Sequence, residues 1–528
     1  MRVHVVGIGP ACMDWHMVSD ILEIADDVSF ESVDRWEDCQ SMAPILFMVA
    51  ARHIPVHEVV WAASKFFRPT VLLLSDEEGV FDVDAFCKAV PQAKVFVQTP
   101  HLDRTYPDQV VGYLPVGYSR AVRAHSLARA EVEKAPPAKT MPVSFSGQVT
   151  HPRREVWANA LEDLASMGLE ADLMFTDGFM QGVSQESYAH TLAAAEICPA
   201  PPGPVTPDTF RFWEALELGG LPAAEDLEYW SVVFPEGFRA TTIPGDLPAE
   251  QEISDWILQR SDVAELIATG VGCSYLEAKW RMRDEIKRAC GALPNTKVFI
   301  SASPVKSHPD SSMLTDTVMS ARRQLPQSTI FVLFDGVRVE QLHLGEVYYE
   351  HVREIVWRCR TDPDWVNVIP VFDGFWRHQA QTFEKALLRL AQPDDLVLFM
   401  EHDTPFLDRL IFWGACAAEA QVGRIIRFHF MQIPEEHEYL MRGNWGDDFI
   451  QTVQWSQRPH LTRADVYAGL LERHFTSKSR TMIEDVLYSP FSTGAEHAEI
   501  LIYAPGADIA YTGHTDGRAG DPKLEMWT

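Results

Sequence analysis

Residues 396–403 form an apolar run that ends in two carboxylates one residue apart: Leu-Val-Leu-Phe-Met-Glu-His-Asp. A segment that is apolar at every position suits a strand buried on both faces, which is typical of a parallel sheet covered by helices. Ligands of open α/β sheets bind beyond the carboxyl ends of such strands, so we expect Glu401 and Asp403 to project there. Two oxygen donors at this spacing suit a divalent cation, although a helix cap or a solvent-facing turn explains them equally well from this run alone.

Short apolar runs of this kind recur along the chain and alternate with helical stretches. The expected strands are residues 3–6, 70–74, 94–98, 110–114, 143–147, 171–175, 298–301, 329–334, 366–371 and 396–400. The expected helices are residues 187–195, 312–324, 345–359 and 379–391, together with most of 248–292. Strands that alternate with helices are the βαβ pattern of parallel sheets, so we expect an α/β fold.

Length and proline content predict how the chain divides. A chain of 528 residues exceeds what one hydrophobic core usually supports. The proline-rich stretch 133–142 predicts an irregular linker, and Leu293-Pro294 ends the helical stretch before it. We therefore expect a Rossmann-like lobe over 1–135, a second such lobe over 140–247, a helical bridge over 248–294 and a mixed α/β domain over 295–528.

Charge and cysteine content limit the partners and the compartment. A formal net charge of −30 opposes a broad binding surface for nucleic acid, although the stretch 473–480 is locally basic. The 8 cysteines show no C-x-x-C pair and no zinc-type spacing, which is typical of reduced thiols. The sequence shows no signal peptide and no run of about 18 apolar residues. We therefore expect a cytoplasmic protein without a membrane span.

Two further polar groups of the carboxyl half lie at the ends of predicted elements. Asp335 follows the strand 329–334, where its carboxylate can accept hydrogen bonds from a base or a ribose, or can cap the turn beside Gly336. Arg377 and His378 precede a predicted helix, and a basic pair at a helix entrance can bind a pyrophosphate.

Adjacent carboxylates, Glu484 and Asp485, follow a short apolar stretch. Such a pair allows one acid to be fixed by hydrogen bonds while the other removes a proton from a sugar hydroxyl; a solvated pair at a helix start is the alternative. A loop upstream has the stacking and hydrogen-bonding groups of an acceptor-binding loop: Trp455, Gln457, Arg458 and His460. Near the carboxyl end, His514 can complete an oxygen-rich metal site, and Arg518 or Lys523 can offset phosphate charge.

In this order, the motifs of residues 295–528 resemble those of a GT-A type glycosyltransferase. The resemblance implies that Asp403 and His514 hold a Mn²⁺ or Mg²⁺ ion and that Glu401 contacts ribose or a metal-bound water. Glu401 departs from the Asp-x-Asp turn of that fold, because it stands in place of the first Asp. Asp485, with Glu484 beside it, is implied as the general base of an inverting transfer. The implied donor, a UDP-sugar, would be bound by Ser303, Asp335, Arg377, His378, Arg518 and Lys523.

Residues of the amino half resemble the exostosin-like GT-B glycosyltransferases, in which the nucleotide lies between two Rossmann-like lobes. The resemblance is carried by Gly147, Arg153, Arg154, Tyr188 and the run 199–222. It implies that Glu214 binds ribose hydroxyls and that Arg153, Arg154 and Arg211 bind the diphosphate. The alternative for Arg211 and Glu214 is an ion pair within one helix. In the first lobe, 75–78 and 98–101 carry polar groups suited to an acceptor site, and none of them stands out as a base.

A GT-B-like half followed by a GT-A half resembles the arrangement of the exostosins. It implies a metal-dependent, bifunctional nucleotide-sugar glycosyltransferase whose carboxyl half transfers a sugar, with inversion, to a hydroxyl of a glycan. Two alternatives stay open. One is a phage DNA glycosyltransferase that acts on hydroxymethylated pyrimidines. The other is a chain in which only the carboxyl half is catalytic and the amino half is a binding or scaffolding module.

Overall fold

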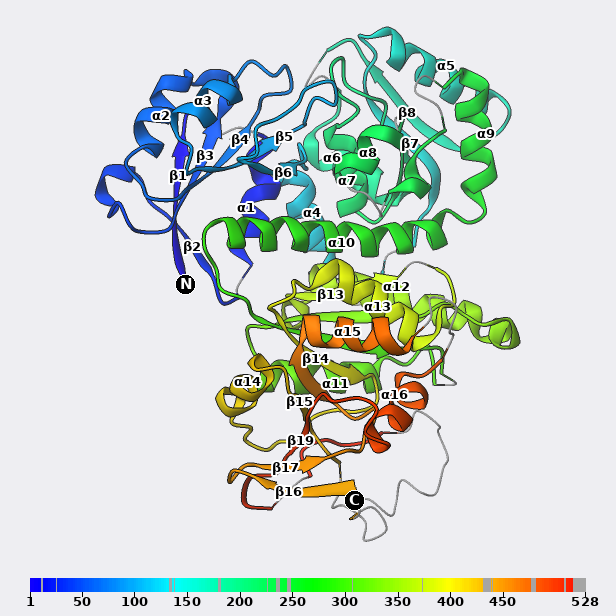
Figure 1. Ribbon diagram of the computed structural model, residues 1–528. Helices are drawn as coiled ribbons and strands as arrows, with labels where there is room; N and C mark the ends of the chain where they lie inside the picture. Colours follow the sequence, from blue (N-terminus) through cyan, green and yellow to red (C-terminus); the bar gives the residue numbers. More distant parts are fainter. Residues whose placement is uncertain are drawn as a thin grey trace. The chain divides into compact units, whose positions relative to one another are not determined.

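The chain folds into two compact units, seen in the computed structural model of Figure 1. The first comprises Met1–Ala292 and Arg360–Asp364, and the second comprises Leu293–Cys359 and Trp365–Thr528. The structure describes residues 1–10, 13–24, 26–132, 135–136, 138–178, 182–225, 227–233, 238–244, 248–305, 307–372, 374–430, 438, 440–475, 481–507 and 510–515. Over these residues, no helix is long and apolar enough to cross a membrane.

The first unit begins with a six-stranded parallel sheet in the order β2-β1-β3-β4-β5-β6. Its strands are β1 (Arg2–Ile8), β2 (Ser29–Ser32), β3 (Ile45–Ala50), β4 (Pro69–Leu74), β5 (Lys94–Gln98) and β6 (Val110–Leu114). The accompanying helices are α1 (His16–Glu23), α2 (Val56–Ala63) and α3 (Val83–Ala89). β3 and β4 are buried at every position, as expected of strands in a sheet that is covered on both faces.

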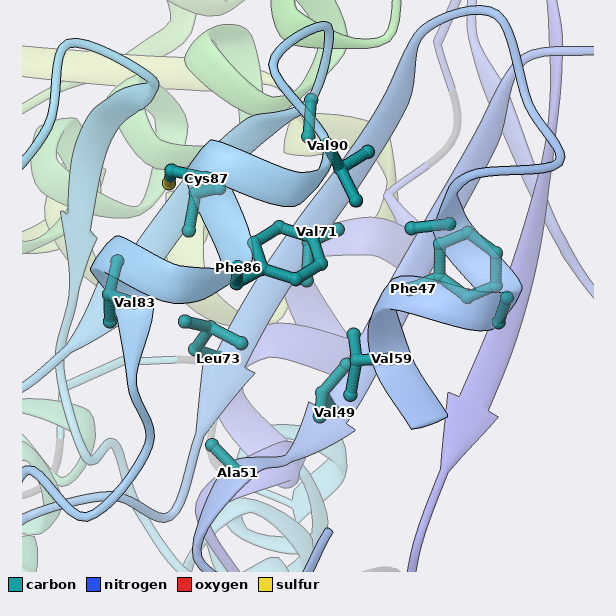
Figure 2. Packing of buried hydrophobic residues seen from close by; sticks show 14 of the residues in the cluster. Phe47, Val49, Ala51, Val59, Val71, Leu73, Val83, Phe86, Cys87 and Val90 are labelled. Atoms are coloured by element: carbon teal, nitrogen blue, oxygen red, sulfur yellow. The ribbon is translucent and has the colours of Figure 1, made fainter. Parts of the chain in front are cut away.

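The spacing of apolar residues in α3 explains how it packs on this sheet. Asp82 begins the helix by accepting a hydrogen bond from the amide of Ala85, at 2.9 Å. Apolar side chains then recur at helical spacing and share one face: Val83, Phe86, Cys87 and Val90. Figure 2 shows this face against the strand residues Val71 and Leu73, within the same buried cluster as α2.

The second sheet of the first unit is also parallel and has the order β10-β9-β7-β8. Its strands are β7 (Met141–Gln148), β8 (Ala171–Thr176), β9 (Ala195–Pro199) and β10 (Leu221–Ala223). The helices around it are α4 (Arg120–Val132), α5 (Pro152–Ser166), α6 (Gln185–Ala194), α7 (Phe210–Glu217), α8 (Leu227–Val233), α9 (Glu250–Ser261) and α10 (Ala264–Ala289). α10 is the long green helix of Figure 1, with 26 residues.

A buried cluster of charges links three helices of the first unit. Glu217, at the end of α7, accepts a hydrogen bond from Arg123 of α4 at 2.5 Å and another from the Tyr275 hydroxyl of α10. Lys279 Nζ, also on α10, lies 3.6 Å from the same carboxylate. Burial by itself raises the pKa of Glu217, but Lys279 and Arg123 outweigh burial and lower the pKa to about 2. The carboxylate therefore stays ionised inside the protein.

The second unit contains one mixed sheet of nine strands, in the order β13-β12-β11-β14-β18-β15-β19-β17-β16. Its strands are β11 (Thr296–Ala302), β12 (Thr329–Phe334), β13 (Val368–Phe372), β14 (Leu396–Glu401), β15 (Ile425–Arg427), β16 (Met441–Trp445), β17 (Phe449–Thr452), β18 (His460–Arg463) and β19 (Ile500–Tyr503). β13, β12, β11 and β14 are parallel, whereas β18 lies antiparallel between β14 and β15.

Six α-helices accompany this sheet: α11 (Ser312–Gln324), α12 (Gly345–Thr361), α13 (His378–Leu390), α14 (Trp413–Gln421), α15 (Ala464–His474) and α16 (Ile483–Ser492). Short 3-10 helices lie at Met13–Trp15, Trp36–Asp38, Ala51–His53, Arg239–Thr241, Val339–Leu344, Pro363–Trp365 and Pro505–Ala507. Under the sheet, Lys297 Nζ forms a fully buried ion pair with Asp395 Oδ2 at 2.8 Å.

The α/β class with parallel-strand sheets is therefore confirmed, and the strands expected at 94–98, 110–114 and 329–334 have those bounds. Other expectations need correction. β3 was not predicted, because its apolar residues suit a helix and a strand alike until β1 and β4 pair with it. Ala195 begins β9 and does not end the preceding helix. Pro142 lies at the start of β7, where a strand tolerates a proline, so the linker expected through residue 142 ends earlier.

Candidate functional site

The parallel strands of the second unit end at one edge of their sheet. Ala302 of β11 pairs with Phe334 of β12, which pairs with Phe372 of β13, and Glu401 of β14 pairs with Ser301. Residues that follow these strands therefore gather at the same edge, where ligands of open α/β sheets bind.

Glu401 and Asp403 lie in the turn after β14 and do not cap a helix. Thr404 closes the turn, since its hydroxyl donates to the Glu401 carbonyl at 2.9 Å and accepts from the Glu401 amide at 3.1 Å. The next α-helix begins only at Trp413. Burial raises the pKa of Glu401 to about 8, and the charge of the neighbouring Asp403 adds to the rise. The helix-cap explanation for this acid pair is thus wrong.

Asp403 and His514 lie close to each other, as expected from the sequence. His514 Nε2 lies 3.6 Å from Asp403 Oδ2, and the Thr515 amide donates to the Asp403 carbonyl at 2.8 Å. Asp403 Oδ1 is buried, and no described residue donates a hydrogen bond to it. A buried carboxylate oxygen without a partner is costly, and a divalent cation would satisfy it.

Asp403 and His514 therefore fit a cation as two ligands. The described part of the chain contains no group of three or more His, Cys, Asp or Glu side chains arranged to hold a metal ion. Beyond the ligands that the described residues offer, water or oxygens of a bound molecule can complete the coordination, as is usual for Mg²⁺. Arg518 and Lys523 lie outside the described residues.

Gln379, which was not singled out from the sequence, connects the acidic turn to α16. Its side-chain amide donates to Glu401 Oε1 at 2.9 Å, and its carbonyl oxygen accepts the Ile483 amide at 3.3 Å. The only signal for it in the sequence was its position directly after Arg377 and His378, at the start of a helix. The contact brings the start of α16 next to the turn after β14.

Glu484 and Asp485 stand in different surroundings at the start of α16. Glu484 is half-buried, and its amide donates to Gln457 Oε1 at 3.0 Å. Burial raises the pKa of the Glu484 carboxyl, against the opposing charge of Arg458. Asp485 is exposed. The partly desolvated member of the pair is thus Glu484.

Arg458 is the cation that faces this cluster of acids. Its guanidinium stacks on the ring of Phe430, 3.8 Å from the ring centroid. Burial lowers the pKa of this guanidinium, whereas three carboxylates raise it: Glu401, Glu484 and Asp403. Within the described residues no carboxylate forms an ion pair with Arg458, so its charge is available to an anionic ligand.

The other residues of the predicted acceptor loop lie in the core. Trp455 is 1% exposed and stacks on Phe491, and His460 is fully buried against the Tyr467 hydroxyl at 2.7 Å. Gln457, 5% exposed, is occupied by the start of α16. Trp455 Nε1 and Gln457 Nε2 are buried without a hydrogen-bond partner among the described residues. Of this loop, Arg458 is the side chain whose charge faces the cluster of acids.

Asp335 anchors the segment before α13. Its Oδ1 accepts the amides of Gly336 at 2.9 Å and Arg377 at 2.8 Å, and burial raises the pKa of its carboxyl. A Cβ on Gly336 would lie 2.3 Å from the Phe375 carbonyl carbon, so glycine permits this close approach. His378 takes a left-handed φ of 64°, an uncommon conformation that occurs often at functional sites. Ser303 is exposed just beyond β11.

Two polar residues that the sequence assigned to a nucleotide in the first unit have partners of their own. Arg153 forms an ion pair with the buried Glu225 at 2.6 Å. Glu214 accepts hydrogen bonds from the Tyr188 hydroxyl at 2.8 Å and the Ser119 amide at 3.3 Å. Glu214 therefore forms no ion pair with a residue of its own helix, and the intrahelical alternative is wrong.

Arg154 and Arg211 lie together at the carboxyl end of β7. Arg211 Nε donates to the Ser146 carbonyl at 2.9 Å, and Arg154 Nη1 donates to the Gln148 carbonyl at 3.5 Å. Carbonyls two residues apart in a strand point the same way, so both guanidiniums lie on one side of it. A Cβ on Gly147 would lie 1.7 Å from Arg211 Nη2, which shows how closely this guanidinium covers the backbone.

Comparisons with known proteins assign no family. No protein-family model and no curated protein matches the chain. Among solved structures, a solute-binding protein of an ABC transporter system from Aeropyrum pernix K1 is similar at 11% identity and a TM-score of 0.19. That match covers 55% of this chain and 90% of the other. At such a TM-score the likeness carries no argument about fold or function.

Proposed function

We propose that the second unit is a metal-dependent nucleotide-sugar glycosyltransferase of the GT-A type, which transfers a sugar with inversion to a hydroxyl of a glycan. The observation that carries the proposal is the meeting of Asp403, His514, Arg458 and Glu484 at the carboxyl edge of one sheet. The sheet itself, four parallel strands followed by an antiparallel one, is compatible with that fold.

The cation would be held by Asp403 and His514, whose fit rests on the unpartnered Asp403 oxygen. When bound, Mn²⁺ or Mg²⁺ offsets the negative charge of a diphosphate leaving group. Glu401 lies beside these ligands and keeps Gln379 in place, a supporting role. Arg458 supplies a positive charge near the same acids, which favours binding of the diphosphate.

The proton of the acceptor hydroxyl would pass to one of the adjacent acids, Glu484 or Asp485. The family resemblance favours Asp485, while burial favours Glu484. Asp335, with one oxygen already accepting backbone amides, would contact the donor through its other oxygen. Arg377, His378 and Ser303 border the same edge and complete the proposed donor site.

A second candidate function concerns the first unit, which we propose to bind a nucleotide sugar in a GT-B-like manner. The observation that favours it is the pair of guanidiniums at a strand end, Arg154 and Arg211, which form no ion pair with an acid among the described residues. The proposed chain is then bifunctional. A non-catalytic first unit is the competing outcome.

The decisive test replaces Asp403 by Asn and assays the full chain against a panel of nucleotide sugars, with and without Mn²⁺. Losing a ligand and its charge should lower the Mn²⁺-dependent part of kcat/KM by about 10²-fold or more. The control is Asp394→Asn, the same change at the exposed opposite end of β14, which should leave turnover unchanged. Undiminished, metal-independent turnover in the Asp403 variant would remove the assignment. A glycan panel assayed beside hydroxymethylated DNA would separate the two acceptor classes.

A further inference from the structure

Three acids follow β4, and among the described residues only Glu77 of the three has no hydrogen-bond or ion-pair partner for its carboxylate. Asp76 is 5% exposed and accepts the amides of Val80 and Phe81 at 2.7 and 3.1 Å. Glu78 is exposed and forms an ion pair with Arg52 at 2.9 Å. Glu77, between them, is half-buried, and no described residue donates a hydrogen bond to its carboxylate. The sequence Asp-Glu-Glu thus contains two structural acids and one that packing does not explain.

Glu77 lies near Arg154, one of the two arginines at the end of β7. Its carboxylate and the guanidinium of Arg154 interact electrostatically, and Arg154 in turn lies close enough to Arg211 for the two like charges to repel. Arg154 is only 6% exposed, and its two hydrogen bonds go to backbone carbonyls. A buried guanidinium without an ion pair is costly to maintain in a folded protein. An anionic ligand bound to the two arginines would stabilise this arrangement.

The remaining charged groups near Glu77 do not compete for its role. They are Asp14, Glu78, Arg52, Arg154 and Asp208. Asp208, the other acid whose pKa burial raises to about 7, is fully engaged: it accepts from the Trp213 indole at 2.7 Å and the Val116 amide at 3.2 Å. A group so enclosed is structural, whereas the Glu77 carboxylate retains access to solvent.

We propose that the first unit holds a second catalytic site, in which Arg154 and Arg211 bind the diphosphate of a nucleotide sugar and Glu77 accepts the proton of the acceptor hydroxyl. The inference rests on the proposed binding of a nucleotide sugar by this unit and adds its general base. The environment of Glu77 suits that task, because burial and the negative charges of Asp14 and Glu78 raise its pKa to about 7.

In the proposed step, the acceptor oxygen forms a bond to the anomeric carbon of the sugar. The bond between that carbon and the phosphate oxygen breaks, and its electron pair leaves with the nucleoside diphosphate. The hydroxyl proton moves to the Glu77 carboxylate. Arg154 and Arg211 offset the charge that develops on the leaving group.

The test uses the full chain carrying Asp403→Asn, so that turnover by the second unit is removed. Release of UDP from a panel of UDP-sugars and calorimetric binding of UDP are measured for Glu77→Gln, Glu78→Gln and Arg154→Gln. Glu77→Gln should lower kcat by about 10²-fold or more and change the Kd of UDP less than about twofold. Arg154→Gln should raise that Kd about tenfold or more. Glu78→Gln, the adjacent exposed acid, removes one of the charges that raise the pKa of Glu77, so it should lower kcat far less than Glu77→Gln and leave the Kd of UDP unchanged.

A pH profile distinguishes a base from a structural residue. In the Asp403→Asn chain, kcat/KM should rise with pH through about 7, since the carboxylate form of Glu77 is the active one, and this rise should be absent in Glu77→Gln. Unchanged turnover in Glu77→Gln would overturn the inference. The inference would also be overturned if the Asp403→Asn chain bound UDP through Arg154 but turned over no UDP-sugar. The first unit would then be a binding module. Neither result affects the assignment of the second unit. That assignment fails if Asp403→Asn leaves the Mn²⁺-dependent turnover of the parent chain unchanged.

Discussion

Glu484 and Asp485 are neighbours in sequence but differ in what surrounds their carboxyl groups. Glu484 is half-buried near Arg458, and Asp485 is exposed. A general base works best when it is partly desolvated and has a raised pKa, so we expect Glu484→Gln to lower kcat by about 10²–10⁴-fold. Asp485→Asn, its matched control, should cost less than about tenfold. Kinetics of the two purified variants with the preferred donor decide between them, and the reverse order of effects would assign the base to Asp485.

The residues of this cluster could be predicted from the sequence as far as their positions after strands allowed. Asp403 lies at the carboxyl edge of the sheet because it follows the parallel strand β14, whereas Glu484 begins α16 and His514 lies in the segment after β19. Exposure could not be predicted in the same way. Trp455 and His460 belong to a polar loop in sequence, yet both side chains turn into the core.

Glu77 is a second residue whose surroundings could not be predicted from the sequence. It lies between Asp76 and Glu78, and the three acids look alike in the sequence. Asp76 differs from Glu77 by its hydrogen bonds to the amides of Val80 and Phe81, a few residues on, and Glu78 differs by its ion pair with Arg52. The ion pair with Arg52 depends on tertiary structure, which the local sequence pattern does not encode.

At the scale of elements, burial decided which strands could be predicted. β5, β12 and β14 are almost wholly buried and apolar, so their sequences predicted strands closely. β2 and β16 are partly exposed and lack an apolar run, and they were not expected. The antiparallel insertion of β18 beside β14 depends on pairing between segments about 60 residues apart, as the partners Leu398 and Leu461 show.

The ion pair of Lys297 and Asp395 predicts a large effect on the stability of the second unit. Both side chains are at most 1% exposed, and Lys297 also donates to the Leu390 carbonyl at 2.8 Å. Asp395→Ala leaves a buried ammonium group without its counter-ion, so the free energy of unfolding should fall by about 3–5 kcal/mol in urea titrations. Asp465→Ala, which breaks an exposed pair with Arg463, should cost less than about 1 kcal/mol. Equal losses of stability in the two variants would show that burial does not increase the contribution of the Lys297–Asp395 pair to stability.

At the scale of the whole molecule, the division into two units predicts separate responses to change. The acid Glu217 belongs to the first unit, as do the cations that hold its pKa down. Its pKa is about 2 in the folded protein and 4.5 for an ordinary glutamate. A carboxyl whose folded pKa is lowered stabilises the fold fully above its unfolded pKa and loses that contribution as the pH falls towards the folded pKa. The shift corresponds to about 3 kcal/mol, lost between about pH 4.5 and pH 2.

Replacing Glu217 by Gln should therefore destabilise the first unit at pH 7 by about 3–5 kcal/mol, because Arg123 and Lys279 lose their buried counter-ion. The difference from the parent chain should shrink as the pH falls below about 4.5, where the parent loses the same interaction.

Calorimetry of the full chain follows both units in one scan. We expect Glu217→Gln to lower only the transition of the first unit and Asp395→Ala only that of the second. A single transition shifted equally by both variants would mean that the units unfold together, and a difference independent of pH would mean that Glu217 is not ionised in the fold.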